Sequence, residues 1–353
     1  MKIIKTILYY ALFLLPIVLQ SQEVPPIQIF SPQDYGAEDQ NWAISQAKKG
    51  FIYVANNEGL LEYDGAKWNL HNSPNEGILR SVRVVGDKIY TGGYRDFGYW
   101  MKNSFGELQY TSLAQSEKFI VKEDEEFWGI IDIEGYVLFQ SFERIYIYNT
   151  TENNFKIIDS DFRINKIFKV DQGIYFQKIG KGIYKIERGE EVLHVPSDQL
   201  LDTEVINMFH IKDGLLIQSK ERGFYTYINQ KIERWSTASD SILSTVSIYS
   251  SARLKNGSFI LGTISNGILH LDAEGKVLRS IDQSRGLSNN TVLSVNEDSY
   301  ENVWLGLDNG INVLNLDSPY RVYKDKQGVL GTVYTSTKTE DYLYLGTNQG
   351  LFF

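Results

Sequence analysis

The sequence contains no cysteine, and this absence removes several kinds of stabilisation and chemistry. Disulfide bonds, a lipid-modified cysteine, thiolate metal sites and cysteine nucleophiles are all excluded. The fold must therefore be stabilised by its hydrophobic core. A chain of 353 residues with 42% apolar and 13% aromatic content has ample material for one large core or several small ones.

Long hydrophobic runs are also absent, apart from one at the N-terminus. Lys2 and Lys5 precede an uncharged apolar run from Ile7 to Leu19, which is typical of a secretory signal peptide. This run is shorter than the roughly 20 residues that a membrane-spanning helix needs. We predict a signal peptide over residues 1–22, with cleavage near Ser21 or Gln22, and an uncleaved anchor is the alternative. In both cases the body, residues 23–353, is exported, and a periplasmic location is expected.

The chain has no excess of positive charge. Its formal net charge is -9, and loss of Lys2 and Lys5 makes it two units more negative, -11. A net acidic body argues against nucleic acid or anionic lipid as the main partner of this segment. No Pro-rich, Gly/Ser-rich or single-charge block interrupts the body, so no internal linker is expected.

One short pattern recurs eight times along the body. Each copy has alternating apolar and aromatic residues, a small or polar residue, a short loop and then renewed apolar alternation, which predicts a β-hairpin. The anchor at the end of the loop is glycine in seven copies and Arg144 in the third; the anchors are residues 59, 98, 144, 182, 223, 267, 310 and 350. Their separations of 38 to 46 residues are typical of a β-propeller. We predict an all-β fold, a propeller of seven or eight four-stranded antiparallel blades.

The stretch from Thr291 onwards shows one repeat in full. It predicts an inner strand at 292–295, a second strand at 303–306, a third at 311–314 and an outer strand at 320–323. Small residues end the second strand in several copies, as expected where the sheets crowd towards a central channel; they are Ala55, Gly93, Gly262, Gly306 and Gly346.

Closure of the ring has two solutions, because the eighth copy stops near its third strand. In the first, residues 27–30 supply an outer strand that completes an eight-bladed ring. In the second, seven blades close and the eighth copy begins a second propeller. We favour the second solution, in which this chain is the N-terminal piece of a longer regulator.

Particular residues in the repeats resemble a known family. The segments 286–292 and 302–311, separated by Glu297-Asp298, are similar to the repeat of two-component regulator propellers, and 59–65 with Trp68 are similar to the start of the same sensors. The resemblance covers roughly residues 27–353 and is strongest over 286–315. These proteins are periplasmic sensor regions of Bacteroidetes-type hybrid two-component regulators or of LuxR-type regulators with a three-tyrosine domain.

This resemblance implies a sensor that detects a ligand outside the cytoplasm. In full-length members the propeller is followed by further blades, an immunoglobulin-like domain, a transmembrane helix and a cytoplasmic kinase or DNA-binding output. It also implies a glycan or another polar small molecule as ligand, a homodimer formed through the parent receptor, and membrane attachment only through those later parts.

Motifs of catalysis and metal binding are lacking. Neither a phosphate-binding loop nor a nucleophile elbow is present, and His71, His194, His210 and His270 lie in different repeats. The acidic run 123–126 lacks the spacing of a calcium loop and is expected to be a solvated turn. We therefore expect no catalytic residue, no metal and no cofactor. A secreted propeller glycosidase or lyase is an alternative function, because the sequence does not reveal the separation of paired carboxylates. A purely protein-interaction or dimerisation propeller is the third alternative.

Ligand contacts are expected at the loops that join the second strand of each blade to the third. In a propeller these loops emerge on one face around the channel mouth, so residues distant in sequence converge there. Aromatic and charged side chains in such loops suit a polar ligand with planar or hydroxylated groups. The candidate ligand-binding residues are Asn57, Tyr94, Arg95, Asp96, Glu143, Arg144, Lys181, Lys220, Glu221, Arg222, Asp308 and Asn309.

Overall fold

The computed structural model describes residues 24–73, 75–115, 119–200, 203–320, 322, 329–340 and 342–353. The predicted signal peptide, residues 1–22, lies outside the described residues. The chain divides into two compact units, of which the larger spans Ile27–Asp317 and the smaller contains Ser318–Phe353. Within the described residues, no helix is long and apolar enough to cross a membrane.

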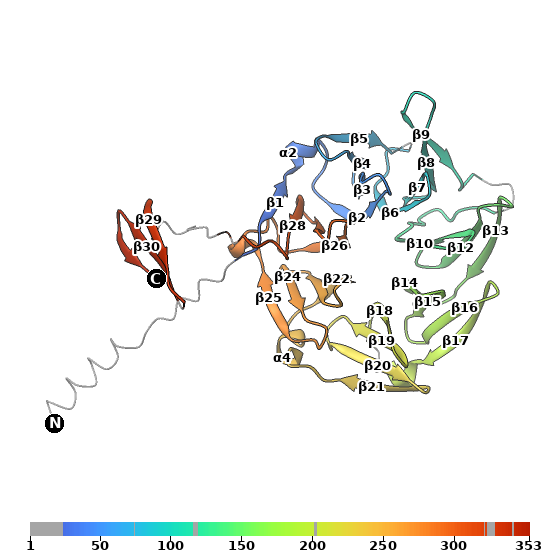
Figure 1. Ribbon diagram of the computed structural model, residues 1–353. Helices are drawn as coiled ribbons and strands as arrows, with labels where there is room; N and C mark the ends of the chain where they lie inside the picture. Colours follow the sequence, from blue (N-terminus) through green and yellow to red (C-terminus); the bar gives the residue numbers. More distant parts are fainter. Residues whose placement is uncertain are drawn as a thin grey trace. The chain divides into compact units, whose positions relative to one another are not determined.

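Seven four-stranded antiparallel sheets make up the larger unit and stand around one axis like blades (Figure 1). Each of the first six blades is a meander of four consecutive strands. Blade 1 contains β2 (Asn41–Gln46), β3 (Ile52–Asn56), β4 (Gly59–Tyr63) and β5 (Trp68–Asn72). Blade 2 contains β6 (Leu79–Val85), β7 (Lys88–Gly93), β8 (Phe97–Lys102) and β9 (Leu108–Ser112). Blade 3 contains β10 (Gly129–Ile133), β11 (Tyr136–Gln140), β12 (Arg144–Asn149) and β13 (Asn154–Asp159).

The remaining blades repeat this order. Blade 4 contains β14 (Ile164–Val170), β15 (Gly173–Lys178), β16 (Gly182–Glu187) and β17 (Glu190–Pro196). Blade 5 contains β18 (Val205–Ile211), β19 (Gly214–Ser219), β20 (Phe224–Ile228) and β21 (Lys231–Trp235). Blade 6 contains β22 (Ile248–Arg253), β23 (Phe259–Thr263), β24 (Ile268–Leu271) and β25 (Val277–Ile281). Blade 7 contains β26 (Val292–Glu297), β27 (Val303–Leu307), β28 (Ile311–Leu314) and, from the other end of the unit, β1 (Ile27–Phe30).

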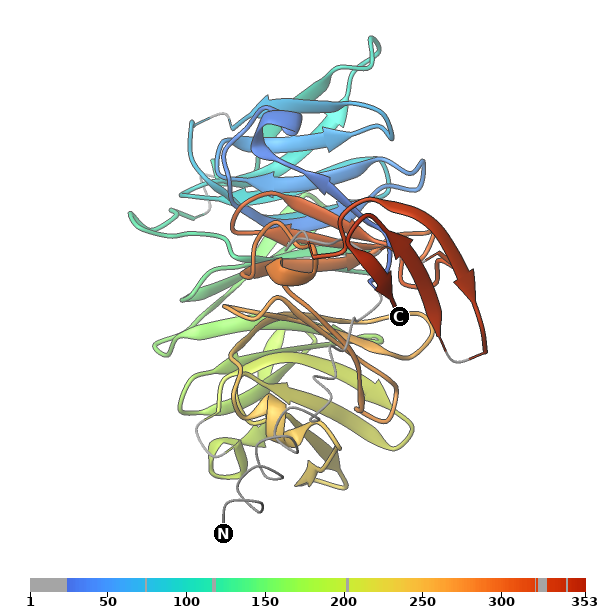
Figure 2. The ribbon, with the colours of Figure 1, turned by 90° about the vertical axis from the view of Figure 1, so that its left-hand side faces the viewer.

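Short helices connect some of these strands. They are α2 (Pro32–Tyr35), α3 (Ser197–Leu200), α4 (Asp240–Leu243) and the 3-10 turn η1 (Gln283–Arg285). The blades twist as they run outwards from the axis, as a view from the side shows (Figure 2).

The seventh blade closes the ring with a strand from the start of the chain. Ile27 pairs with Leu314 and Phe30 pairs with Ile311, so β1 runs antiparallel to β28. The predicted outer strand 320–323 is therefore wrong for this blade: Tyr320 belongs to no strand, and Arg321 and Tyr323 lie outside the described residues. The physical reason is that a strand from the opposite terminus pairs the open edge of β28 and ties the two ends of the ring together.

The eighth repeat forms a separate three-stranded sheet in the smaller unit. It contains β29 (Val333–Lys338), β30 (Leu343–Thr347) and β31 (Gly350–Phe352). Most of its side chains are exposed; Tyr334 is 75% exposed and Phe353 is 80% exposed. The ring thus closes with seven blades, and the eighth repeat is not one of them.

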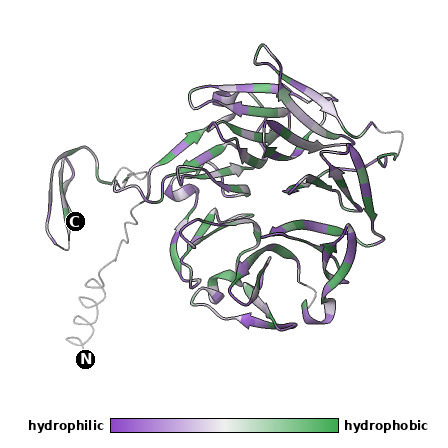
Figure 3. Cartoon of the chain, turned by 45° about the vertical axis from the view of Figure 1, so that its right-hand side comes forward, coloured by the Kyte–Doolittle hydropathy of each residue, from purple (hydrophilic) through white to green (hydrophobic). Residues whose placement is uncertain are grey.

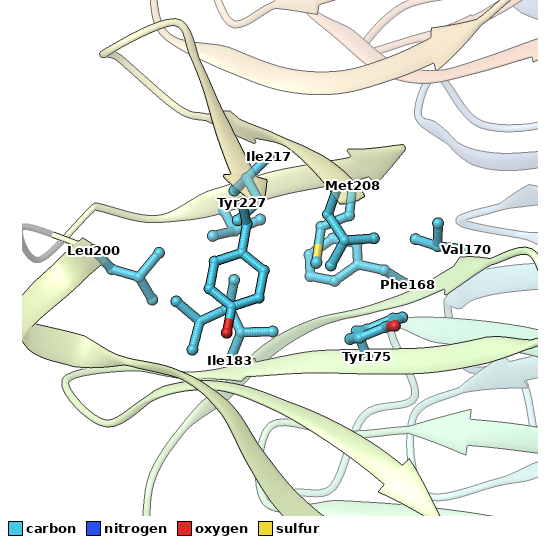
Figure 4. Packing of buried hydrophobic residues seen from close by; sticks show 11 residues of the cluster. Phe168, Val170, Tyr175, Ile183, Leu200, Met208, Ile217 and Tyr227 are labelled. Atoms are coloured by element: carbon cyan, nitrogen blue, oxygen red, sulfur yellow. The ribbon is translucent and has the colours of Figure 1, made fainter. Parts of the chain in front are cut away.

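The hydrophobic core of the ring lies between adjacent blades. Hydrophobic residues recur along the strands of every blade (Figure 3). The second strands β3, β23 and β27 are buried at every position, and successive residues point to opposite faces, so both faces of these sheets are packed. Phe168 and Ile183 of blade 4 pack against Met208 and Ile217 of blade 5 (Figure 4). Tyr227 joins this cluster and donates a hydrogen bond from its hydroxyl to the carbonyl of His194, 2.7 Å away. A single blade has no partner for these faces, which is why the repeats must assemble radially.

Close approach of neighbouring blades explains the predicted small residues. A Cβ atom on Gly306 would lie 2.3 Å from Ser294 Oγ and 2.4 Å from the carbonyl oxygen of Asn41 in blade 1. Blades 3, 4 and 5 carry glutamine at the corresponding place and bridge to the next blade by hydrogen bonds. Gln140 donates to the carbonyl of Ile164 at 3.2 Å, and Gln177 donates to the carbonyl of Thr203 at 2.8 Å. The inner ends of the blades are therefore in direct contact.

Candidate functional site: a cavity at the channel mouth

A cavity of about 440 Å³ lies where the inner strands of all seven blades begin. Its lining comes mainly from one equivalent position in each blade, at or just before the start of the inner strand. These residues are Trp42, Arg80, Trp128, Asn165, Ile206, Tyr249 and Leu293, and Lys166 follows Asn165 in the same strand. Two second-to-third-strand loops add Phe142 and Lys220, and the connections between blades add Arg163 and Glu204.

A β-bulge places these side chains on the channel. Six of the seven inner strands in the described chain shift register after their first residue; Trp42 lies in the bulge of β2, Arg80 in that of β6 and Tyr249 in that of β22. Blade 3 has no such shift in β10, and Trp128 precedes that strand, with its backbone N–H donating to Gln140. An extra residue in one strand re-aims its side chain away from the ladder. The bulge therefore turns a sheet position into a channel-lining position.

Aromatic rings and guanidinium groups alternate along one wall of the cavity. The Arg80 guanidinium carbon lies 4.3 Å from the ring centroid of Trp42 and 4.5 Å from that of Trp128. Trp128 stacks on Phe142 at 5.3 Å, and the Arg163 guanidinium carbon lies 3.6 Å from the Phe142 centroid. These cation–π contacts hold flat side chains in fixed orientations. The wall is thus a preformed set of planar surfaces and positive charges.

Amines and a carboxylate form the opposite wall. Lys166 Nζ donates to the carbonyl of Tyr249 at 2.6 Å, and Lys220 Nζ lies 2.8 Å from Glu204 Oε2. Glu204 Oε1 accepts a hydrogen bond from Asn165 at 2.8 Å. Burial pushes the pKa of Glu204 upwards, but the hydrogen bond and charge of Lys220 outweigh it, and the pKa lies below its ordinary value. Glu204 is therefore ionised at neutral pH.

Burial lowers the pKa of Lys166 to about 8, and the nearby charge of Lys220 acts in the same direction, whereas that of Glu204 opposes it. A lysine in this position is still protonated at pH 7, but at a cost in solvation. Such a perturbed group in a cavity is a mark of a functional site.

Among the predicted site residues, Lys220 lines the cavity, and Asn57 and Asp308 lie beside it. Asn57 Oδ1 accepts a hydrogen bond from Trp42 Nε1 at 2.7 Å, and Asn57 donates to Gln40 Oε1 at 3.1 Å. Gln40 in turn donates to Asp308 Oδ1 at 2.6 Å. This chain of bonds fixes the Trp42 ring across the junction of blades 1 and 7.

The other predicted residues occupy their loops without lining this cavity. Tyr94, Arg95, Glu143, Lys181, Glu221, Arg222 and Asn309 are exposed. Within this group, Glu143 forms an ion pair with Lys122, and Lys181 lies over the ring of Phe162. Asp96 accepts hydrogen bonds from Tyr110 and Ser112, and burial raises its pKa despite both bonds.

Arg144, the residue in place of the anchor glycine, is held within blade 3. Its guanidinium bonds to Asp159 Oδ1, to the Tyr146 hydroxyl at 3.1 Å and to the carbonyl of Ile120 at 3.0 Å. We expect Arg144→Ala to lower the free energy of unfolding by about 1 kcal/mol, because these bonds are lost, and to leave ligand affinity unchanged. Urea unfolding and calorimetry measure the two effects. Weaker ligand binding with unchanged stability would place Arg144 in the site instead.

The acidic run 123–126 differs from the predicted solvated turn at two positions. Glu125 is buried and accepts hydrogen bonds from Ser141 Oγ at 2.6 Å and from the Tyr146 hydroxyl at 2.8 Å. Glu126 lies 3.3 Å from Arg80. Within the part of the chain that the structure describes, no group of three or more His, Asp or Glu residues could hold a metal ion.

The residues that sequence reasoning missed are those in the bulges. A usable signal was present: the equivalent position holds Trp, Arg, Trp, Asn, Ile, Tyr and Leu in successive blades, whereas the position before it is apolar in six of the seven blades. Variation at one position of an otherwise regular repeat indicates that the side chain at this position does not pack in the core between blades.

No family model and no curated protein matches this chain. Solved structures similar to it include the extracellular domain of the hybrid two-component system BT4673 from B. thetaiotaomicron, with a TM-score of 0.64 and 17% identity, covering 94% of this chain and 45% of that one. The extracellular domain of the hybrid two-component system BT3049 from the same organism matches with a TM-score of 0.62 and 17% identity, over 93% of this chain and 49% of that one. This chain thus spans less than half the length of these structures.

A streptogramin B lyase is also similar, with a TM-score of 0.66, 13% identity and coverage of 83% of this chain and 98% of the lyase. At these identities the likeness concerns the fold. The described chain has the β-propeller architecture found both in extracellular sensor domains of two-component regulators and in a lyase.

Proposed function

We propose that the ring, residues 27–317, is the extracytoplasmic ligand-sensing domain of a signal-transduction regulator and that it binds a glycan or another polar small molecule in the channel-mouth cavity. The observation that carries this proposal is that all seven blades contribute side chains to one cavity with aromatic planes and charged groups. Binding there can bias the packing of every blade, which a sensor needs. The periplasmic location predicted from residues 1–22 and the fold shared with sensor domains support it.

A binding screen tests this proposal directly. We expect the purified protein to be stabilised by members of a panel of oligosaccharides in thermal-shift measurements, with calorimetry giving the affinity. Trp128→Ala should weaken binding about tenfold, because it removes a planar surface from the cavity wall. Phe105→Ala is the matched control, since Phe105 is 86% exposed in the turn between β8 and β9. Equal loss in both variants, or no binding across the panel, would contradict the proposal.

The lyase and glycosidase alternative gives a different result in the same samples. Product formation from a polysaccharide, abolished by Glu204→Gln, would favour an enzyme, because Glu204 is the carboxylate that lines the cavity. Binding without turnover is expected for a sensor. A strictly monomeric protein that binds a saccharide would argue against a purely dimerisation role.

We also infer that residues 1–22 are a signal peptide and that β29–β31 begin a second propeller in a longer regulator. Sheet β29–β31 supports the second inference, because β29 has the same register shift as the inner strands of the ring, at Tyr334. Its apolar side chains, such as Leu351 at 69% exposure, need neighbouring sheets to cover them. Reading the coding sequence past Phe353 tests this: further repeats of about 40 residues are expected, and an immediate stop codon would contradict it.

A further inference from the structure

Positive charge is concentrated in the cavity of an otherwise acidic protein. The lining includes four cationic side chains, Arg80, Arg163, Lys166 and Lys220, and one carboxylate, Glu204. The whole chain has a formal net charge of -9. A cavity whose charge opposes the net charge of the protein focuses the local potential on a ligand of opposite sign.

Two of these four cations have a carboxylate partner among the described residues and two have none. Lys220 pairs with Glu204, and Arg80 lies 3.3 Å from Glu126 through one terminal nitrogen. For Arg163 and Lys166, no carboxylate of the described residues lies within 4.0 Å. Placing these cations together is unfavourable by itself and is offset when an anion binds between them.

Hydrogen-bond donors of the cavity wall also lack acceptors. Arg80 Nε and Trp128 Nε1 are buried and have no hydrogen-bond partner among the described residues. Buried donors are nearly always paired in folded proteins, because an unpaired one costs free energy. Both belong to residues that line the cavity. A small shift of these side chains would let both N–H groups donate hydrogen bonds to acceptor oxygens of a ligand.

The aromatic groups favour a sugar over a simple inorganic anion. Trp42, Trp128, Phe142 and Tyr249 all line the cavity, and they add apolar ring surface beside the charges. A sugar ring has an apolar face for such a surface, and its hydroxyls can donate to Glu204. A volume of about 440 Å³ is also in the range of small-ligand sites and larger than one inorganic ion needs.

We infer that the ligand is an acidic saccharide, whose carboxylate or sulfate group is held by Arg80, Arg163 and Lys166 while its ring lies against the aromatic wall. This inference rests on the proposed function and adds the chemical class of the ligand. Arginine suits this role because its planar fork bonds carboxylate and sulfate oxygens in pairs.

Calorimetry with three oligosaccharides of similar size tests the inference. The probes are trigalacturonate, which has carboxylates, a sulfated disaccharide from heparin, and neutral galactotriose. At least one acidic probe should bind about tenfold or more tightly than the neutral one, and the affinity should fall as salt is raised. The better of the two acidic probes identifies carboxylate or sulfate as the recognised group.

Matched variants locate the binding. Arg163→Met and Arg80→Met should each weaken binding of the acidic probe about tenfold. Arg83→Met is the control, because Arg83 is on the same strand as Arg80 but pairs with Asp132 outside the cavity. Thermal unfolding checks that each variant folds. If Arg80→Met does not fold, the test rests on Arg163→Met, since Arg163 is exposed.

Each outcome separates this inference from the proposed function. Galactotriose bound as tightly as the acidic probes would overturn the acidic class and leave the sensor proposal standing. Acidic probes that bind the folded Arg163→Met variant as tightly as wild type would overturn the placement of the anionic group. If none of the three probes and no member of the wider panel binds, the proposed function is overturned, and the inference with it.

Discussion

The Trp304→Ala variant should lose about 3–5 kcal/mol of free energy of unfolding, the range for removal of a large buried aromatic side chain. Trp304 is 6% exposed in β27. Its ring packs against Phe30 of the closing strand at 6.2 Å and against Tyr63 of blade 1 at 5.8 Å. Its indole N–H also donates to Asp298 at 2.9 Å. One side chain thus joins blade 7, the closing strand and blade 1.

The control for this effect lies in the turn before the same strand. Tyr300 is 76% exposed, so Tyr300→Ala should change the free energy of unfolding by no more than about 0.5 kcal/mol. Urea unfolding followed by circular dichroism measures both variants. A loss below about 1 kcal/mol for Trp304→Ala would mean that the closing contact adds little to the ring. Equal losses in both variants would mean that the turn, and not the buried indole, carries the effect.

The Lys166→Met variant should be more stable than wild type by about 1–3 kcal/mol at pH 7 and should bind the anionic ligand about tenfold more weakly. The charged amine is costly to bury, as its pKa of about 8 indicates, and methionine keeps the aliphatic stem without the charge. The groups that face the amine are Glu204 from the connection before blade 5, Lys220 from blade 5 and Tyr249 from blade 6. Removing the charge therefore removes the desolvation cost of the buried amine, which a bound anion otherwise offsets.

The pH dependence of this difference has a definite sign. The folded-state pKa of Lys166 lies below that of the unfolded chain, so the penalty is fully present below about pH 8 and disappears as the pH rises towards the ordinary value of 10.5. Over this window wild type should approach the variant in stability, and its affinity for an anion should fall. Lys169→Met on the same strand is the control, because Lys169 is exposed and pairs with Asp132. A destabilised Lys166→Met protein at pH 7 would show that the bond to the Tyr249 carbonyl matters more than the burial cost.

Much of the fold could be predicted because the repeat is local. Each repeat consists of about forty consecutive residues. The strands within 291–314 were predicted close to their observed bounds. The small residues at the inner ends of the blades, such as Gly306, were predicted from crowding, and their contacts with the next blade confirm it.

The candidate site was predicted less well, because its residues depend on register and not on loop composition. Charged residues in the loops were the visible signal, yet Lys220 alone among them lines the cavity. Arg80 and Lys166 lie on inner strands, where a polar side chain in a regular strand would face a neighbouring blade. A bulge, which exists only through pairing with the second strand, turns them to the channel.

The amino-acid sequence alone determined the radial all-β architecture, since period-two apolar patterns with turns between them can bury both faces of a sheet only against other sheets. The tertiary structure decided three things: that seven blades close, that β1 supplies the last strand, and that one bulge position from each of several blades forms a single cationic and aromatic cavity. The reason is that closure and convergence depend on angles and register between segments far apart in the chain, which no local pattern encodes.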